Sequence, residues 1–139
     1  MGDLTVTAAQ VAPCLPESAE IVPGIAGVTI TAGQVVYVIA ASGKLGLADE
    51  DASAEASQVW GVALNGGGAG QAVDVLRRGP MYGFTLTALS YGAACSLSAT
   101  AGALLDTGAV TNIVGRVMAL SDANLTKVLF VDCTLAAAS

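Results

Sequence analysis

The sequence has 139 residues, of which 54% are hydrophobic and 12% are charged, and it contains no histidine. Without histidine, Ser-His and Cys-His nucleophile pairs and imidazole zinc ligands are excluded, so catalysis or metal binding would depend on carboxylates and three cysteines. We therefore expect one domain that is not an enzyme and that holds neither a metal nor a cofactor.

Charge is scarce for a chain of this length. Ordinary domains carry about 25% charged residues, and the mean hydropathy here is +0.70. We interpret this as a surface partly covered by other subunits or by a partner. A net charge of -6 with only five Lys and Arg residues argues against nucleic-acid binding. No apolar run reaches the roughly 20 residues of a membrane helix, and no basic region of a signal peptide is present, so we expect no membrane partner.

The cysteines and the basic pair have simple structural interpretations. Cys14, Cys95 and Cys133 show no Cys-x-x-Cys spacing, which favours small buried thiols in a reducing compartment. Arg77 and Arg78 are the only adjacent basic residues. With Asp74 just upstream, we interpret them as a solvated or interface end of a strand.

Residues 1–24 are predicted to form an extended N-terminal arm. They hold three of the four prolines and no Lys or Arg, and Leu4 and Val6 alternate with Thr5 and Thr7. Prolines disfavour a central strand, while the alternation suits an extended segment. We expect this arm to be flexible in the free protein and to become ordered on a partner.

Residues 25–139 are predicted to form a single β-barrel domain. Short β-type runs alternate with glycine turns, a spacing typical of an all-β fold, here a small β-barrel or β-sandwich. One or two helical turns are expected at 49–58, capped by Asp51. The expected strands are 28–31, 35–39, 45–47, 59–64, 73–76, 82–87, 95–97, 103–105, 114–120 and 127–134.

An internal echo relates residues 28–79 to residues 86–135. Two glycines of the first part recur at one offset (92 − 33 and 102 − 43 both equal 59), and a third recurs at a shorter one (115 − 61 = 54). The difference fits an acidic insertion at 49–58 that 106–112 replaces with a shorter stretch. The echo predicts two similar halves that bury each other's apolar sides. The glycine pairs are Gly33 and Gly92, Gly43 and Gly102, and Gly61 and Gly115.

One motif suggests chemistry. Asp106-Thr107-Gly108 resembles the active-site triplet of retroviral-type aspartic proteases, in which two such loops share a proton. In those enzymes a flap separates the triplet from the apolar-apolar-Gly element, whereas Gly115 follows Gly108 by only seven residues (115 − 108 = 7). We interpret Asp106 as a turn residue equivalent to Asp49, and keep a retropepsin-like aspartic protease as an alternative.

The other motifs have ordinary structural interpretations. The glycine-rich stretch 65–70 lacks the Gly-Lys-Ser/Thr ending of a phosphate loop and is interpreted as a hairpin connection. Trp60 is expected in the core, and Asn124 in a turn rather than glycosylated. The carboxylates of 49–55 lack the pattern of a calcium loop and are interpreted as a solvated acidic loop.

The order of these elements resembles that of the head decoration (capsid cement) proteins of tailed bacteriophages. The resemblance covers roughly residues 21–135 and rests on the apolar N-terminal segment with its prolines, the run 28–37, Gly43-Lys44-Leu45, the Ala-rich acidic stretch, 59–64, 70–76 and Gly79. It implies a non-enzymatic β-barrel or β-sandwich protein, often trimeric, that binds the outer surface of the expanded head and bridges major capsid subunits. The implied location is the virion surface, with the host cytoplasm during assembly.

The predicted capsid-contacting residues lie in the arm, because an extended apolar segment can add a strand to an exposed sheet edge. The expected partners are the major capsid protein and further copies of the chain in a homotrimer. Two alternatives besides the protease stay open: another virion β-barrel, from a tail or head fibre, and a bacterial β-barrel binding module. The candidate arm residues are Leu4, Thr5, Val6, Val11 and Leu15.

Overall fold

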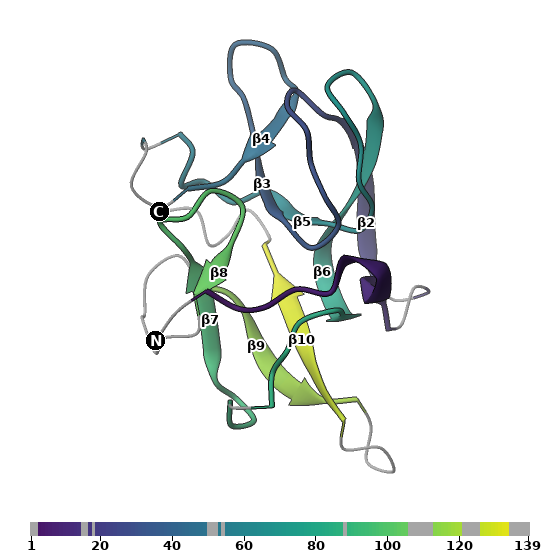
Figure 1. Ribbon diagram of the computed structural model, residues 1–139, viewed down its shortest axis with the longest axis vertical. Coiled ribbons are helices and arrows are strands. Elements are labelled where there is room, and N and C mark those ends of the chain that lie inside the picture. The colour runs from purple at the N-terminus through teal and green to yellow at the C-terminus, as the bar shows by residue number, and fades with distance from the viewer. Residues whose placement is uncertain are drawn as a thin grey trace.

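The protein is nearly all β, as predicted, and its strands form one strongly curled antiparallel sheet (Figure 1). The computed structural model describes residues 3–14, 17, 19–49, 53, 55–87, 89–105, 113–120 and 126–133. Within these residues there is one turn of 3-10 helix, η1 (Ala8–Gln10). The strands are β1 (Ala12–Pro13), β2 (Glu20–Ile25), β3 (Val35–Val38), β4 (Leu45–Leu47), β5 (Gly61–Ala63), β6 (Ala72–Tyr82), β7 (Ala94–Leu97), β8 (Leu104–Leu105), β9 (Ile113–Ala119) and β10 (Lys127–Asp132).

The strand order is symmetric about the centre of the sheet. It runs β4-β3-β5-β6-β10-β9-β7-β8, with β1 and β2 also paired to β6. Thus β3, β4, β5 and β6 of the first half correspond to β7, β8, β9 and β10 of the second. The fold consists of two similar halves joined through β6 and β10.

Equivalent strands also pair in the same register. Val36 lies opposite Gly61 and, at the equivalent place, Cys95 lies opposite Gly115. The closing strands agree as well, since Val62 faces Leu76 and Arg116 faces Phe130. These pairs follow the same two offsets that the glycines show in the sequence. A slip of one residue would exchange the buried and exposed faces of a strand. Because the register is shared, equivalent residues of the two halves face the same side of the sheet.

Gly61 and Gly115 are required by the close approach of neighbouring backbone. A Cβ at Gly61 would lie 2.6 Å from the Leu76 carbonyl oxygen, and one at Gly115 would lie 2.5 Å from the carbonyl oxygen of Phe130. Leu76 and Phe130 are themselves equivalent. Glycine therefore serves the same purpose in both halves, namely to let the strands cross without a steric clash.

Strand β6 belongs to both halves. Its first part pairs with β2, with Val22 opposite Val75, and its last part pairs with β10, with Met81 opposite Leu129. At the offsets of 59 and 54 these two pairs are equivalent. The C-terminal end of β6 is therefore the first strand of the second half, as β2 is the first strand of the first half.

The core follows from this pairing. A larger cluster of buried apolar side chains includes Leu76, Met81 and Leu129, and a smaller one includes Val73 and Val75. The β6 residues of both clusters are at most 1% exposed. The alternation of buried Val73 and Val75 with exposed Asp74 is that expected of a half-buried strand.

Two expectations need correction. A separate extended arm of residues 1–24 is not confirmed, because its predicted boundary falls inside β2, which pairs along β6. The expected helix at 49–58 is a short turn in its described residues, in which the Ala56 N–H donates to the Ser53 hydroxyl. Asp51, its expected cap, lies outside the described residues. The arm was predicted because prolines disfavour a central strand. A strand at the rim of a sheet tolerates proline, and Pro23 lies in β2.

Candidate functional site

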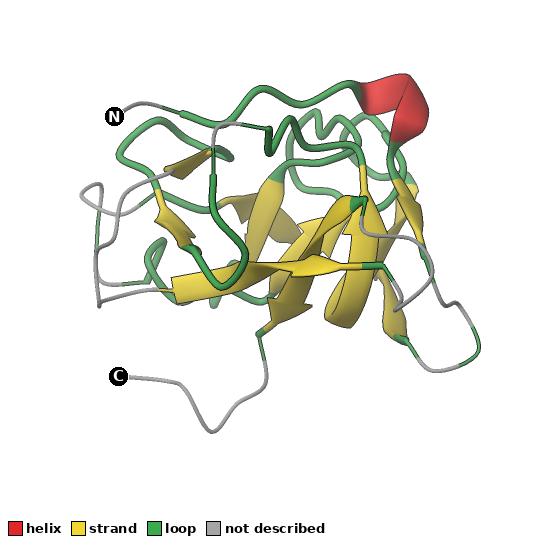
Figure 2. Cartoon of the chain, turned by 90° about the horizontal axis from the view of Figure 1, so that it is seen from below, coloured by secondary structure: helices red, strands yellow, loops and turns green. Residues whose placement is uncertain are grey.

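Residues 3–14, hereafter the N-terminal segment, lie along the chain's own sheet (Figure 2). The Leu4 N–H donates to the Leu104 carbonyl at 2.7 Å, and the Thr5 carbonyl accepts from the Thr85 N–H at 2.9 Å. Further along, β1 pairs antiparallel with the end of β6, where Ala12 lies opposite Tyr82. The main chain of the segment is thus bound to the domain rather than held out for a partner.

The side chains of the candidate residues support this placement. Leu4 and Val11 pack against the larger core cluster. Val6 covers Gly33 so closely that a Cβ there would collide with it. Thr5 is exposed, and Leu15 lies outside the described residues. The segment therefore belongs to the packed domain, and its contact with a capsid stays a prediction.

Strand β2, which lies at the rim of the sheet in Figure 1, carries a stripe of exposed apolar side chains. Ile21 and Ile25 are 36% and 44% exposed, and Pro23 between them is exposed as well. Val22 and Gly24 point the other way, opposite the buried Val75 and Val73. We call Ile21, Pro23 and Ile25 the β2 stripe. Large apolar side chains lined up on one strand are more typical of a contact surface than scattered ones.

The stripe was not predicted, although the sequence carries a signal for it. Ile21, Pro23 and Ile25 follow the period of two that marks one face of a strand. The three prolines of residues 1–24 favoured an extended arm over a strand of the sheet. The stripe, and not the N-terminal segment, carries the large exposed apolar side chains of this region.

Arg77 is buried inside the domain, which corrects its interpretation as a solvated or interface end of a strand, whereas Arg78 is exposed. The Arg77 guanidinium stacks on the Trp60 ring at 3.7 Å from its centroid. It donates from Nε to the Trp60 carbonyl at 2.9 Å and from Nη2 to the Cys133 carbonyl at 2.7 Å. Glu20 lies 3.7 Å from Nη1. With its donors so engaged, Arg77 joins strands and is not available to a ligand.

The three cysteines are free thiols. Cys95 and Cys133 are buried, and burial raises the pKa of the Cys133 thiol to about 12. Cys14 is half-buried, and burial also raises its pKa, partly offset by a hydrogen bond with Tyr82. A raised pKa keeps the thiols of Cys14 and Cys133 protonated and poorly nucleophilic.

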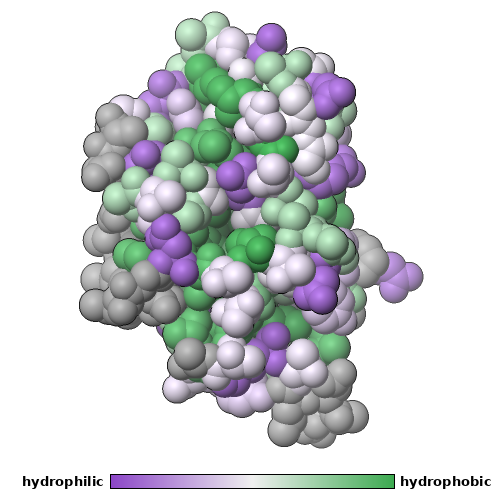
Figure 3. All heavy atoms as spheres, in the orientation of Figure 1, coloured by the Kyte–Doolittle hydropathy of each residue, from purple (hydrophilic) through white to green (hydrophobic). Residues whose placement is uncertain are grey.

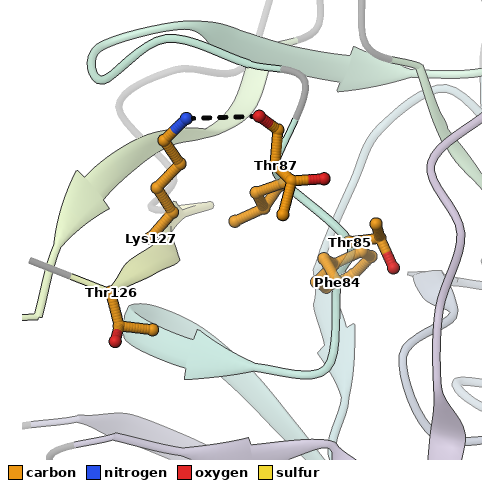
Figure 4. A pocket seen from close by; sticks show the side chains of 6 residues that line it. Phe84, Thr85, Thr87, Thr126 and Lys127 are labelled. Carbon is orange, nitrogen blue, oxygen red and sulfur yellow. Dashed lines mark hydrogen bonds between the residues drawn. The ribbon is translucent and has the colours of Figure 1, made fainter.

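A pocket of about 450 Å³ opens beside Lys127 (Figure 4). Its lining combines Phe84 and Leu86 with three threonines. The Lys127 ammonium donates to the carbonyls of Leu89, at 2.5 Å, and Thr87, at 3.4 Å. Because the cation is held by main-chain carbonyls, it adds little binding capacity to the pocket.

The remaining sequence motifs supply no site in the described chain. Asp106 and Asn124 lie outside the described residues. The stretch 65–70 joins β5 to β6 in a hairpin, as predicted, and Gly67 bridges Ile30. No three His, Cys, Asp or Glu side chains of the described residues are grouped closely enough to hold a metal ion.

On the face drawn in Figure 3, hydrophilic residues are scattered among apolar and weakly polar ones. Across the described ranges, no helix has the length and apolar character needed to cross a membrane. Comparison with protein-family models, with curated proteins and with solved structures finds no match to this chain.

Proposed function

We propose that this protein is a structural virion component, a decoration (cement) protein that binds the outer surface of a tailed-phage head and stabilises it by bridging major capsid subunits. The observation that carries the proposal is the β2 stripe, an exposed apolar strand at the rim of a small all-β domain whose surface is poor in charge. Such a surface suits many repeated contacts with a lattice better than one deep ligand site.

The arrangement of the polar groups supports a structural function. Arg77, the most buried cation, is engaged with two carbonyls, a ring and a carboxylate. The buried Cys133 thiol has a pKa far above neutrality. These groups stabilise the fold, and the order of sequence elements that resembles the decoration proteins points in the same direction.

In this proposal the protein acts as a homotrimer, because low charge and 54% hydrophobic residues favour burial of surface between copies. Light scattering on the purified protein and on the protein released from capsids is expected to give a trimer mass. A monomer in both states would reject the trimer and leave capsid binding to be judged by itself.

Co-sedimentation tests the proposal directly. Purified protein is mixed with unexpanded and with expanded capsids assembled from the major capsid protein of the same virus. The expected result is saturable binding to expanded capsids, which then resist heating or dilution better than undecorated ones. Absence of binding to both forms at micromolar protein would overturn the proposal.

A further inference from the structure

The connection between β5 and β6 carries the one Asn-Gly pair of the sequence, Asn65-Gly66, and both residues are exposed. The other two asparagines, Asn112 and Asn124, are each followed by a bulky apolar residue. Glycine has no side chain to hinder the approach of its nitrogen to the amide carbon of the preceding asparagine. The chemistry of this pair therefore depends on how the hairpin holds the amide and the nitrogen.

The Asn65 amide is bound to the opposite strand. The Leu64 N–H donates to the Asp74 carbonyl at 2.8 Å, and the Asp74 N–H donates to Asn65 Oδ1 at 3.0 Å. The side-chain carbonyl thus takes the place that a main-chain carbonyl has in a regular antiparallel pair. A main-chain N–H aimed at this oxygen stabilises negative charge that develops on it, as the donors of an oxyanion hole do.

The Gly66 nitrogen is not bound in this way, although its neighbours are. The Gly67 N–H donates to the Ile30 carbonyl at 2.9 Å. The Gly68 N–H donates to Gln71 Oε1 at 2.6 Å. The Gly66 N–H belongs to an exposed residue and has no acceptor among the described residues. It can therefore lose its proton to hydroxide from the solvent without breaking a hydrogen bond of the hairpin.

We propose that Asn65 is a site of covalent modification, where the folded hairpin promotes deamidation. The Gly66 nitrogen gives its proton to hydroxide and attacks Asn65 Cγ, so that a C–N bond closes a ring and the carbonyl electron pair moves onto Oδ1. The Asp74 N–H stabilises that charge. Because the nucleophile and the amide belong to adjacent residues, the reaction is intramolecular and needs no partner besides water and hydroxide.

The remaining steps release ammonia and consume water. The electron pair on Oδ1 restores the carbonyl, and the bond from Cγ to Nδ2 breaks. The leaving nitrogen takes a proton from water, which regenerates hydroxide, and departs as ammonia. Water then opens the cyclic imide at one of its two carbonyls. Opening at the main-chain carbonyl of Asn65 gives isoaspartate, and opening at the former side-chain carbonyl gives aspartate.

Both products change the hairpin. Aspartate adds a negative charge close to Asp74, whose N–H holds the side chain of Asn65. Isoaspartate adds one methylene to the main chain between β5 and Gly67, which exchanges two hydrogen bonds with Ile30, at 2.8 and 2.9 Å. A longer main chain at this point no longer matches that register. We therefore expect the isoaspartate form to melt at a lower temperature than the unmodified protein.

The test uses mass spectrometry of the full-length wild type, incubated at pH 8 either folded or unfolded in guanidinium chloride and then digested with trypsin. The three asparagines fall in separate peptides, 45–77, 79–116 and 117–127. In the folded protein we expect peptide 45–77 to deamidate at least about tenfold faster than the other two, and no more slowly than in the unfolded chain. Asn65→Gln, whose ring closure would need one more methylene, is the control and should leave this peptide unmodified.

Two outcomes would overturn the proposal. One is slower deamidation of peptide 45–77 in the folded protein than in guanidinium chloride, because the hydrogen bond from Asp74 would then protect the amide. The other is an equal rate at all three asparagines of the folded protein. Ion exchange separates the modified forms, and an isoaspartate form that melts like the wild type would refute the expected change of register. None of these outcomes depends on capsid binding, so the modification site and the proposed function are tested separately.

Discussion

Arg78 and Asp132 occupy the same position in the two halves of the domain and lie opposite each other, in register, on β6 and β10. Arg78 Nε is 3.7 Å from Asp132 Oδ2. A residue placed at the centre of a two-fold repeat faces its own equivalent, so two identical charges there would repel each other. The present pair, of opposite sign, avoids this repulsion.

A charge cycle measures this relationship. Arg78→Asp places two carboxylates opposite each other and is expected to lower the free energy of unfolding by about 0.5–1 kcal/mol, since both side chains are half exposed. The exchanged pair, Arg78→Asp with Asp132→Arg, should recover most of that loss in urea unfolding. Equal losses in the single and double variants would show that the pair does not interact.

The glycines at the strand crossings should be intolerant of a methyl group. Gly61→Ala and Gly115→Ala each place a Cβ against a carbonyl oxygen of the neighbouring strand, and we expect a cost of about 1–3 kcal/mol in each case. Gly68→Ala is the control, because its Cβ would meet only the Gln71 side chain, at 3.6 Å. A change of less than about 0.5 kcal/mol in all three would contradict the close approach.

The adjacent arginines should respond very differently to replacement by lysine. Arg77→Lys loses the stacking on Trp60 and one or both main-chain hydrogen bonds while keeping a buried charge, so we expect a loss of about 2–4 kcal/mol. Arg78→Lys keeps an exposed charge and should change stability by about 0.5 kcal/mol or less. Urea unfolding of the two variants side by side checks the difference, and equal effects would contradict the burial of Arg77.

The thiols predict both reactivity and pH dependence. Cys14 should react first with an alkylating reagent at pH 8, and Cys95 and Cys133 only after unfolding, as intact mass would show. Because burial raises the Cys133 pKa from 9.0 to about 12, the unfolded state loses its proton first as pH rises through this range. The wild type should therefore lose stability there relative to Cys133→Ala, by at most ~1.4 kcal/mol per pH unit. A constant difference between the two from pH 7 to 11 would refute the shift.

The N-terminal segment should contribute to stability. Leu4→Ala and Val11→Ala remove side chains that pack on the core, and each is expected to cost about 1–2 kcal/mol, whereas the exposed Thr5→Ala should be nearly neutral. Deleting residues 2–14 should lower the melting temperature by several degrees, and a peptide of residues 3–14 should restore it. If the deletion leaves the melting temperature unchanged, the segment does not stabilise the domain and is a free arm.

Sequence patterns located most strands of the sheet but missed β2 and most of the length of β6. Apolar runs bounded by glycine predicted β4 at its observed bounds and located β3, β7 and β10 within a few residues. The expected strand 73–76 covers only the first part of β6, because glycine and proline, here Gly79-Pro80, usually end a strand, and the expected strand 82–87 shares only Tyr82 with it. Gly79 adopts a φ of +134° and lets the chain continue into the second half.

The candidate site was less accessible to sequence reasoning. Both Leu4 with Val6 and Ile21 with Ile25 show strand alternation, but alternation does not say which face meets solvent or which edge is already paired. The structure resolves this for the residues it describes, since β1 pairs with the end of β6 while β2 pairs with β6 alone. Long-range pairing of this kind depends on contacts far apart in the chain.

The sharing of β6 between the halves has a consequence for unfolding. In arrays whose repeats meet only at an interface, one repeat can melt while its neighbour persists. Here β6 pairs with strands of both halves, so unfolding of one half removes a strand that the other half needs. Neither half can therefore stay folded alone. We expect a single cooperative transition, with calorimetric and van't Hoff enthalpies equal. The two similar halves are thus expected to unfold as one unit.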